Sequence, residues 1–214
     1  EGRVERLPDL AAELVRLKVD VIVAVLNPTI QAVKQATTTI PVVMVNSVDP
    51  VGNGLVASLA RPGGNITGLS NLGHELSGKL LELLKGAVPG VFRVAFLGNP
   101  DVPHSALAFK ETKVAARVLG VELQLVEVRG AAEFESAFSA MTRERAGALI
   151  VHTPMPLFFA HRKQIADLAV KNRLPAIYVN RDYVDAGGLM SYGARLPDLF
   201  RRAATYVDKI LKGA

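Results

Sequence analysis

Apolar runs of strand length alternate along this chain with amphipathic stretches of helix length. Residues 19–26 are apolar apart from Asp20 and rich in β-branched side chains, which is typical of a strand buried on both faces. Residues 7–17 place leucines three or four positions apart, which predicts a helix with one apolar face. The same patterns predict strands at 40–45, 93–97, 121–128, 148–152, 175–179 and 188–192, and helices at 29–37, 75–88, 105–119, 132–144, 157–173 and 197–212.

This alternation determines the predicted fold class. Strands that alternate with helices form right-handed βαβ units, in which helices cover both faces of a parallel sheet. We therefore expect an α/β protein with parallel sheets. Residues 46–71 interrupt the alternation, because they are rich in glycine, proline and asparagine, and we expect turns there rather than a regular element.

A repeated pattern bears on whether the strands form one sheet or two. Ile40-Pro41 opens one predicted strand and Asn46 ends it, while Leu174-Pro175 and Asn180 do the same for another. The repeat favours two similar halves over a single sheet in which the likeness arises by chance. Open α/β sheets bind ligands at the carboxyl ends of their strands, so two facing lobes would bring both sets of polar residues to one cleft.

Composition narrows the function classes. Half of the 214 residues are apolar and 21% are charged, which excludes a disordered chain, and the absence of cysteine excludes disulfides and thiolate metal sites. The net charge of +5 is scattered, with no basic stripe among aromatic residues, so nucleic-acid binding is not predicted. No apolar run reaches the 18–20 residues, roughly, of a membrane-spanning helix.

The catalytic and cofactor motifs are missing or out of context. Gly52-x-Gly54-x-x-Ala57 resembles a dinucleotide fingerprint, but several residues separate it from the preceding strand, so a turn and short helix is favoured. The four histidines lack metal-ligand spacing, and His152 is interpreted as a packing residue rather than a catalytic one. We therefore expect no catalytic residue, no metal and no cofactor.

Polar residues suited to binding without chemistry follow the predicted strands. Asparagine offers both a donor and an acceptor, helix starts favour anionic groups, arginine can bind a carboxylate through two hydrogen bonds, and tyrosine can stack on a flat ligand. For each residue alone, a turn or capping role is at least as plausible. The candidates are Asn27, Thr29, Asn46, Asn99, Ser105, Asn180, Arg181, Tyr178, Tyr183 and Tyr192.

One long segment and several short ones resemble a known family. The distinctive segment runs from Asp49-Pro50-Val51-Gly52 through Arg61-Pro62-Gly63-Gly64-Asn65 to Gly68, and residues 10–24, 36–43, 175–178 and 186–193 add to it. On these residues, the chain resembles the ABC-transporter substrate-binding proteins of the tryptophan/tyrosine-import-like group. The resemblance implies a type I periplasmic-binding fold: two Rossmann-like lobes with parallel sheets, joined by a hinge.

In that fold, lobe 1 would comprise residues 1–89 and 186–214, and lobe 2 residues 90–185. Members of the family are longer at both ends, so we expect this chain to be truncated at both ends. Residues 1–6 lack the apolar stretch of a signal peptide. The resemblance nevertheless implies a periplasmic or lipoprotein-anchored extracytoplasmic protein whose leader is absent from this chain.

The resemblance also implies the ligand site and the partners. It adds Ser47, Thr153 and Pro154 to the candidate ligand residues, because they belong to loops that would line the family's cleft. The implied function is an extracytoplasmic receptor of an ABC importer that closes on a small ligand, most plainly an aromatic amino acid or related carboxylate. Its partners would be that ligand and a membrane permease, with no nucleic acid, and the receptor would be a monomer.

Two alternatives remain open from the sequence. The chain could be the effector-sensing domain of a transcriptional regulator, which would need a DNA-reading segment elsewhere. Less favoured is a small α/β enzyme that uses His152 or Asp182.

Overall fold

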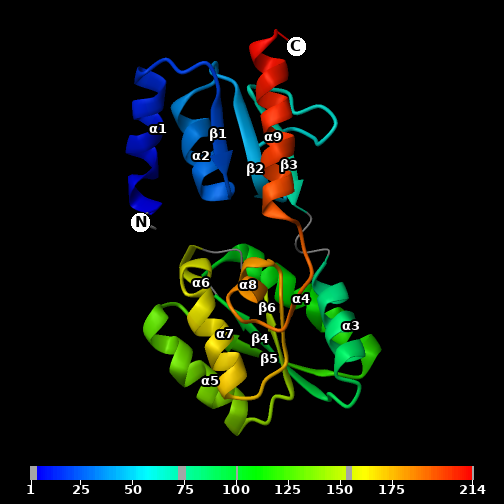
Figure 1. Ribbon diagram of the computed structural model, residues 1–214. Helices are drawn as coiled ribbons and strands as arrows, with labels where there is room; N and C mark the ends of the chain where they lie inside the picture. Colours follow the sequence, from blue (N-terminus) through cyan, green and yellow to red (C-terminus); the bar gives the residue numbers. More distant parts are fainter. Residues whose placement is uncertain (1–3, 72–75, 100, 153–155, 214) are drawn as a thin grey trace. The chain divides into compact units, whose positions relative to one another are not determined.

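The computed structural model describes residues 4–71, 76–99, 101–152 and 156–213 (Figure 1). The chain folds into two compact units, Glu1–Leu72 with Arg195–Ala214, and Gly73–Ala194. Each unit holds one sheet, and every strand pair within these sheets is parallel. The predicted α/β class is confirmed, and the strands form two sheets rather than one.

Unit 1 is a small three-layered α/β structure. Its sheet has the order β1-β2-β3. On β2, Val42 and Met44 pack with α2 and β1, whereas Val43 and Val45 point to the opposite face and are also fully buried, where α9 contacts β2 and β3. The elements are η1 (Val4–Arg6), α1 (Leu7–Arg16), β1 (Ile22–Val25), α2 (Asn27–Ala36), β2 (Val42–Val48), β3 (Ile66–Asn71) and α9 (Leu196–Leu211).

Strand β3 corrects the expectation that residues 46–71 contain only turns. It pairs in parallel with β2, and Gly68 lies opposite Met44 with φ +135°. A Cβ on Gly68 would collide with the backbone of Met44, so only glycine fits this close approach. Gly68 and the turn-forming residues around it do not show the apolar pattern of a strand. Strand β3 forms because it pairs with β2, and a local sequence pattern does not predict such a tertiary contact.

Strand β2 also runs further than predicted. It continues past Val45 to Val48, with an irregular register between Met44 and Ser47, and Asn46 has φ +57° within that stretch. Irregularities of this kind re-aim side chains at the end of a strand.

Unit 2 is a larger α/β structure whose sheet has the order β5-β4-β6-β7-β8. One core contains side chains of α5 and α7, and the other contains side chains of α3 and α4. The elements are α3 (Ser77–Ala87), β4 (Arg93–Gly98), α4 (Pro103–Leu119), β5 (Glu122–Glu127), η2 (Ala131–Glu133), α5 (Phe134–Arg143), β6 (Ala148–Val151), α6 (Pro156–Ala160), α7 (Arg162–Lys171), β7 (Ala176–Tyr178), α8 (Asp182–Asp185) and β8 (Met190–Ser191).

The unit boundaries differ from the expected residues 89–90 and 185–186. Helix α3 belongs to unit 2, since it packs on α4 and its leucines Leu80, Leu81 and Leu84 are buried beside Phe96 of β4. The chain returns to unit 1 only at Arg195, because β8 still pairs with β7. An amphipathic sequence pattern predicts that a helix has a buried face, but it does not predict which sheet covers that face.

The proline-opened strands occupy equivalent places in the two sheets. The carbonyl of Pro41 accepts a 2.9 Å hydrogen bond from the N–H of Ile22 on β1, and the carbonyl of Pro175 accepts one of the same length from Leu149 on β6. Each proline therefore precedes its strand and contributes its acceptor to the neighbouring strand. A proline has no N–H to donate, so the first position of a strand suits it.

Candidate functional site

In unit 1, the carboxyl ends of β1 and β2 are joined by the side chain of Asn27. Its Nδ2 donates to the Val48 carbonyl (2.7 Å), and its Oδ1 accepts from the Ser47 hydroxyl and the Val48 N–H (both 2.9 Å). The structure thus brings Asn27 and Ser47 together. Both also contribute to holding the strand ends in place, because three hydrogen bonds converge on one amide.

The other two candidates of unit 1 lie beside this bridge in the sequence. Asn46 precedes Ser47 in the irregular part of β2 and is 5% exposed. Thr29 lies in the first turn of α2 and is half-buried. The first N–H groups of a helix have no intrahelical partner, so the backbone near Thr29 can receive an acceptor.

In unit 2, Asn99 and Ser105 meet at the carboxyl end of β4. The Asn99 N–H donates to the Ser105 hydroxyl (3.1 Å), and the Asn99 side-chain oxygen accepts from the Asp101 N–H (2.9 Å). Both residues are buried. This pattern is a polar turn between β4 and α4, which the asparagine stabilises through its own backbone neighbours.

His152 follows β6 and is a packing residue, as interpreted from the sequence. It is 1% exposed, its Nε2 lies 3.2 Å from the Ser77 hydroxyl, and its ring stacks on Phe96 and lies 5.4 Å from the ring of His104. The ring is thus packed among side chains of unit 2. Two further candidates, Thr153 and Pro154, lie outside the described residues.

The candidates after β7 and β8 are more exposed. Arg181 directly precedes α8, and its side chain is 73% exposed, 3.5 Å from the carboxylate of Asp185. Asn180 is half-buried, and its carbonyl accepts from the Tyr183 N–H. Tyr192 is 40% exposed, and its N–H donates to the Tyr178 carbonyl (2.9 Å). These side chains are therefore accessible to a solute.

Tyr178 and Tyr183 stack on each other instead of offering free faces. Their ring centroids lie 4.7 Å apart at 12°, and both side chains are fully buried. Within the part of the chain that the structure describes, neither hydroxyl has a hydrogen-bond partner. Burial raises the pKa of both phenols. A buried hydroxyl without a partner is costly, so this stack is a polar feature inside an apolar core.

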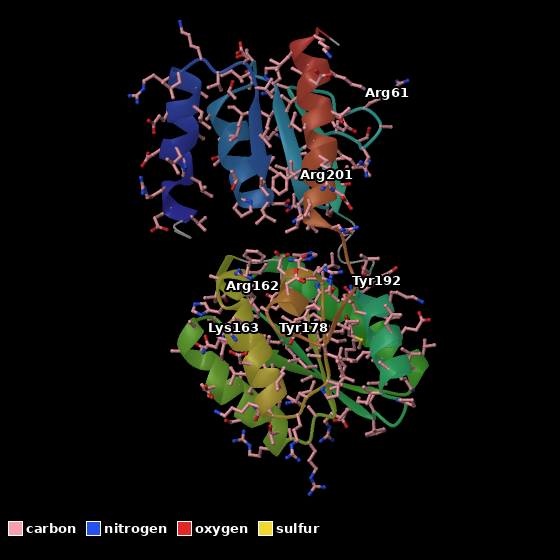
Figure 2. The ribbon with its side chains drawn as sticks, viewed as in Figure 1. Arg61, Arg162, Lys163, Tyr178, Tyr192 and Arg201 are labelled. Carbon is pink, nitrogen blue, oxygen red and sulfur yellow. The ribbon has the colours of Figure 1, made fainter. Side chains whose placement is uncertain are left out.

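A cation that the sequence did not suggest lies at the same end of unit 2. The guanidinium of Arg162 lies 4.7 Å from the ring centroid of Phe159, and its Nη1 donates to the Phe159 carbonyl (2.9 Å). Figure 2 shows Arg162 beside α6. We expected one helix over residues 157–173, whereas the structure ends α6 at Ala160 and starts α7 at Arg162. The spacing Phe159-x-x-Arg162 was the available signal.

Unit 1 also contains an open pocket of about 450 Å³. It is lined by Lys34 and by residues 54–57 and 62–66, and none of the predicted site residues lines it. Among the described residues, no group of three or more acidic, histidine or cysteine side chains could hold a metal. The helices of that same part of the chain are all too short or too polar to span a membrane.

The sequence matches one family along its whole length. A profile of the family described as ABC transporter substrate binding protein covers residues 1–214. A tyrosine-binding protein of Clostridioides difficile (strain R20291) is 28% identical over 204 residues, which are 95% of this chain and 58% of that protein. The chain therefore spans less than two thirds of this relative's length.

Two solved structures are similar over the whole chain. A conserved domain protein of Vibrio cholerae is 28% identical with a TM-score of 0.88, and the match covers 71% of it. A protein domain of Streptococcus pneumoniae, solved in complex with L-Trp, is 26% identical with a TM-score of 0.86, and the match covers 73% of it. Both matches cover 100% of this chain.

Proposed function

Because the chain belongs to the family of ABC transporter substrate-binding proteins and has their type I periplasmic-binding fold, we propose that it is the solute receptor of an ABC importer. Its proposed ligand is an aromatic amino acid or a related aromatic carboxylate. The observation that carries this proposal is the match to two proteins whose names or titles give tyrosine and L-Trp.

The polar residues at the strand ends support the proposal. Open α/β sheets bind ligands at the carboxyl ends of their strands, because helix N-termini and loop side chains gather there. We propose that both units contribute ligand contacts from these ends. The proposed contacts are Asn27, Thr29, Asn46 and Ser47 from unit 1, and Asn99, Ser105, Thr153, Pro154, Asn180, Arg181 and Tyr192 from unit 2.

A receptor of this kind binds its ligand without changing it. We propose that the protein acts outside the cytoplasm, where it delivers the ligand to a membrane permease. A ligand that prefers one conformation of the protein shifts the population toward that conformation, and the permease can then distinguish the loaded receptor from the empty one. The driving force is differential affinity rather than a chemical step.

Thermal unfolding with a panel of solutes tests the proposal. L-Tyr, L-Trp, L-Leu and D-ribose are each added at increasing concentration to the purified protein. A ligand at 100 times its dissociation constant stabilises a protein by about 2.7 kcal/mol. For a chain of this size, that corresponds to a rise in melting temperature of roughly 5–10 °C. We expect such a rise with L-Tyr or L-Trp and none with D-ribose.

Mass spectrometry of the recovered solute completes the test. A receptor returns L-Tyr or L-Trp unchanged after prolonged incubation, whereas an enzyme converts it. A response to D-ribose or L-Leu alone would contradict the proposed ligand class, and conversion of the solute would favour the enzyme alternative.

A further inference from the structure

Arg162 lies at the edge of the unit 2 sheet where strands β6 and β7 end. Helix α6 follows β6, and α7 begins at Arg162 directly after α6. Helix α8 follows β7 and contacts α7. Figure 1 shows α6 and α8 at this same end of the sheet, and Figure 2 places Arg162 there. The guanidinium therefore belongs to the part of unit 2 where α/β proteins bind solutes.

The position of this guanidinium is fixed by two consecutive phenylalanines. Phe158 is fully buried and packs edge-to-face on Phe134 of α5, with ring centroids 5.5 Å apart. Phe159 is half-buried and contacts Arg162 through its ring and its carbonyl. Since Phe158 anchors α6 in the core, the arginine is held in place before any ligand arrives. Such preorganisation lowers the entropy lost on binding.

Arg162 differs from the neighbouring cations in that no carboxylate of the described residues pairs with it. Lys163 pairs with Asp167 at 2.9 Å, and Arg181 pairs with Asp185 at 3.5 Å. In the described ranges, no carboxylate lies within ion-pair distance of Arg162, although its side chain is half-buried. A partly desolvated charge is normally paired. A guanidinium has five N–H donors, so its bond to the Phe159 carbonyl leaves several for an incoming acceptor.

Tyr183 of the buried tyrosine stack lies within the electrostatic reach of this arginine. Burial raises the pKa of the Tyr183 phenol, and the positive charge of Arg162 opposes that rise. Tyr183 belongs to α8, which contacts α7. Tyr183 and Arg162 therefore belong to two helices that contact each other at the strand ends.

We propose that Arg162 binds the carboxylate of the ligand and is the principal cation of the site. This inference rests on the proposed function, and it gives to Arg162 the role that the sequence suggested for Arg181. A planar guanidinium matches a carboxylate through two parallel hydrogen bonds, and its partial burial strengthens them relative to those of an exposed arginine. The ligand would supply the negative charge that the described part of the protein does not place beside Arg162.

Calorimetric titration with pairs of ligands tests this assignment. L-Tyr is compared with tyramine, and L-Trp with tryptamine, because each amine keeps the ring and the amino group but lacks the carboxylate. In Arg162→Met, which keeps an apolar stem and removes the charge, we expect the affinity for L-Tyr or L-Trp to fall about 10- to 100-fold. The affinity for the amines should stay unchanged.

Two further variants separate charge from geometry. Arg162→Lys keeps the charge but lacks the planar guanidinium. Its affinity for L-Tyr or L-Trp should therefore lie between that of the unchanged protein and that of Arg162→Met. Arg201→Met is the matched control, because it removes an exposed guanidinium that pairs with Asp198 in unit 1. We expect it to change the affinity less than about 3-fold.

Each contrary outcome has its own meaning. If the parent protein binds L-Tyr or L-Trp and Arg162→Met binds them equally well, the assignment of Arg162 is wrong while the proposed function stands. Equal losses for the amino acids and the amines would also overturn it, because Arg162 would then act through folding alone. If the parent binds neither amino acid, the proposed function fails and the assignment falls with it. The melting temperature of each ligand-free variant reports whether it is folded.

Discussion

The strands β2 and β7 open with the same short pattern, but the two units use their carboxyl ends differently. In unit 1, the strand continues through an irregular stretch, and Asn27 binds the Ser47 and Val48 end of it with three hydrogen bonds. In unit 2, the strand ends at Tyr178, whose ring stacks on Tyr183 of α8. One end is a satisfied polar network, and the other is an aromatic stack with two buried hydroxyls that lack partners among the described residues.

The difference shows that two strands with the same sequence pattern can be stabilised at their carboxyl ends by different interactions. Hydrogen bonds that are all made within the protein fix the backbone and leave mainly N–H groups for a ligand. The aromatic stack of unit 2 offers no free ring face, whereas the half-buried guanidinium of Arg162 keeps N–H donors that could bind a ligand. We infer that the carboxyl end of β2 is held in place mainly by hydrogen bonds, and that of β7 mainly by aromatic packing. Four predictions test this comparison.

The largest effect is expected where a glycine lets a neighbouring segment approach the proline-opened strand. In unit 1, a Cβ at Gly68 would meet the backbone of Met44, and in unit 2 a Cβ at Gly193 would meet the backbone of Val179. Gly68→Ala should lower the free energy of unfolding by about 3 kcal/mol or more, because it adds a clash to an unfavourable φ. Gly193→Ala should also destabilise, through the clash alone.

Urea unfolding measures both, and Gly64→Ala is the control, since a Cβ there meets nothing within 4 Å. Equal stabilities of Gly68→Ala and Gly64→Ala would show that β3 does not approach β2 as described.

The next effect concerns the two asparagines at the strand ends. Asn27→Ala removes one donor and the acceptor of two hydrogen bonds, so we expect a loss of about 2–3 kcal/mol in the free energy of unfolding. In Asn180, the hydrogen bond among the described residues is made by the backbone carbonyl, which alanine keeps. Asn180→Ala should therefore cost less than about 1 kcal/mol. If the two variants lose equal stability in urea unfolding, the asymmetry between the units is wrong.

The smallest effect is expected from the tyrosine stack. Tyr183→Phe removes a buried hydroxyl without a partner among the described residues, so the free energy of unfolding should rise by about 0.5–1 kcal/mol at pH 7. Chemical unfolding of Tyr183→Phe and of the exposed Tyr192→Phe measures this difference. A loss of more than about 1 kcal/mol in Tyr183→Phe would mean that its hydroxyl makes a hydrogen bond in solution.

The same variant has a pH signature. Burial raises the pKa of Tyr183 above its ordinary value of 10.0, so the phenol stays protonated in the folded protein at a pH where the unfolded chain ionises. Its contribution to stability is thus complete below pH 10.0 and decreases as the pH rises beyond it. We expect the parent to lose stability between about pH 9.5 and 11, and Tyr183→Phe to lose less. If the free energy of unfolding decreases equally with pH in both proteins, Tyr183 does not cause this pH dependence.

Much of the fold could be predicted because the buried faces of helices and strands produce a regular spacing of apolar residues in the sequence. The continuous apolar runs gave the central strands, and the amphipathic stretches gave the long helices within a few residues. The repeat around Pro41 and Pro175 correctly indicated two sheets, and the structure places both prolines in the same hydrogen-bonding position. Strand β3 could not be predicted, because Gly68 is required by the nearness of Met44 rather than by any local pattern.

The candidate site divides in the same way. Asparagine and serine at strand ends were found because turns favour them, and the structure pairs Asn27 with Ser47 and Asn99 with Ser105. Arg162 was missed because the amphipathic pattern runs through His161, where the structure separates α6 from α7. A break between two helices depends on what each one packs against: Phe158 is fully buried against Phe134, whereas Phe159 is half-buried beside Arg162.

The amino-acid sequence by itself determined the α/β class, the positions of most strands and the family, because these depend on local periodicity and on a distinctive segment. Only the tertiary structure decided which sheet each helix covers, where unit 1 ends and which arginine stands unpaired among the described residues at the strand ends of unit 2. Those features arise from contacts between residues far apart in the chain, and such contacts produce no regular pattern of residues in the local sequence.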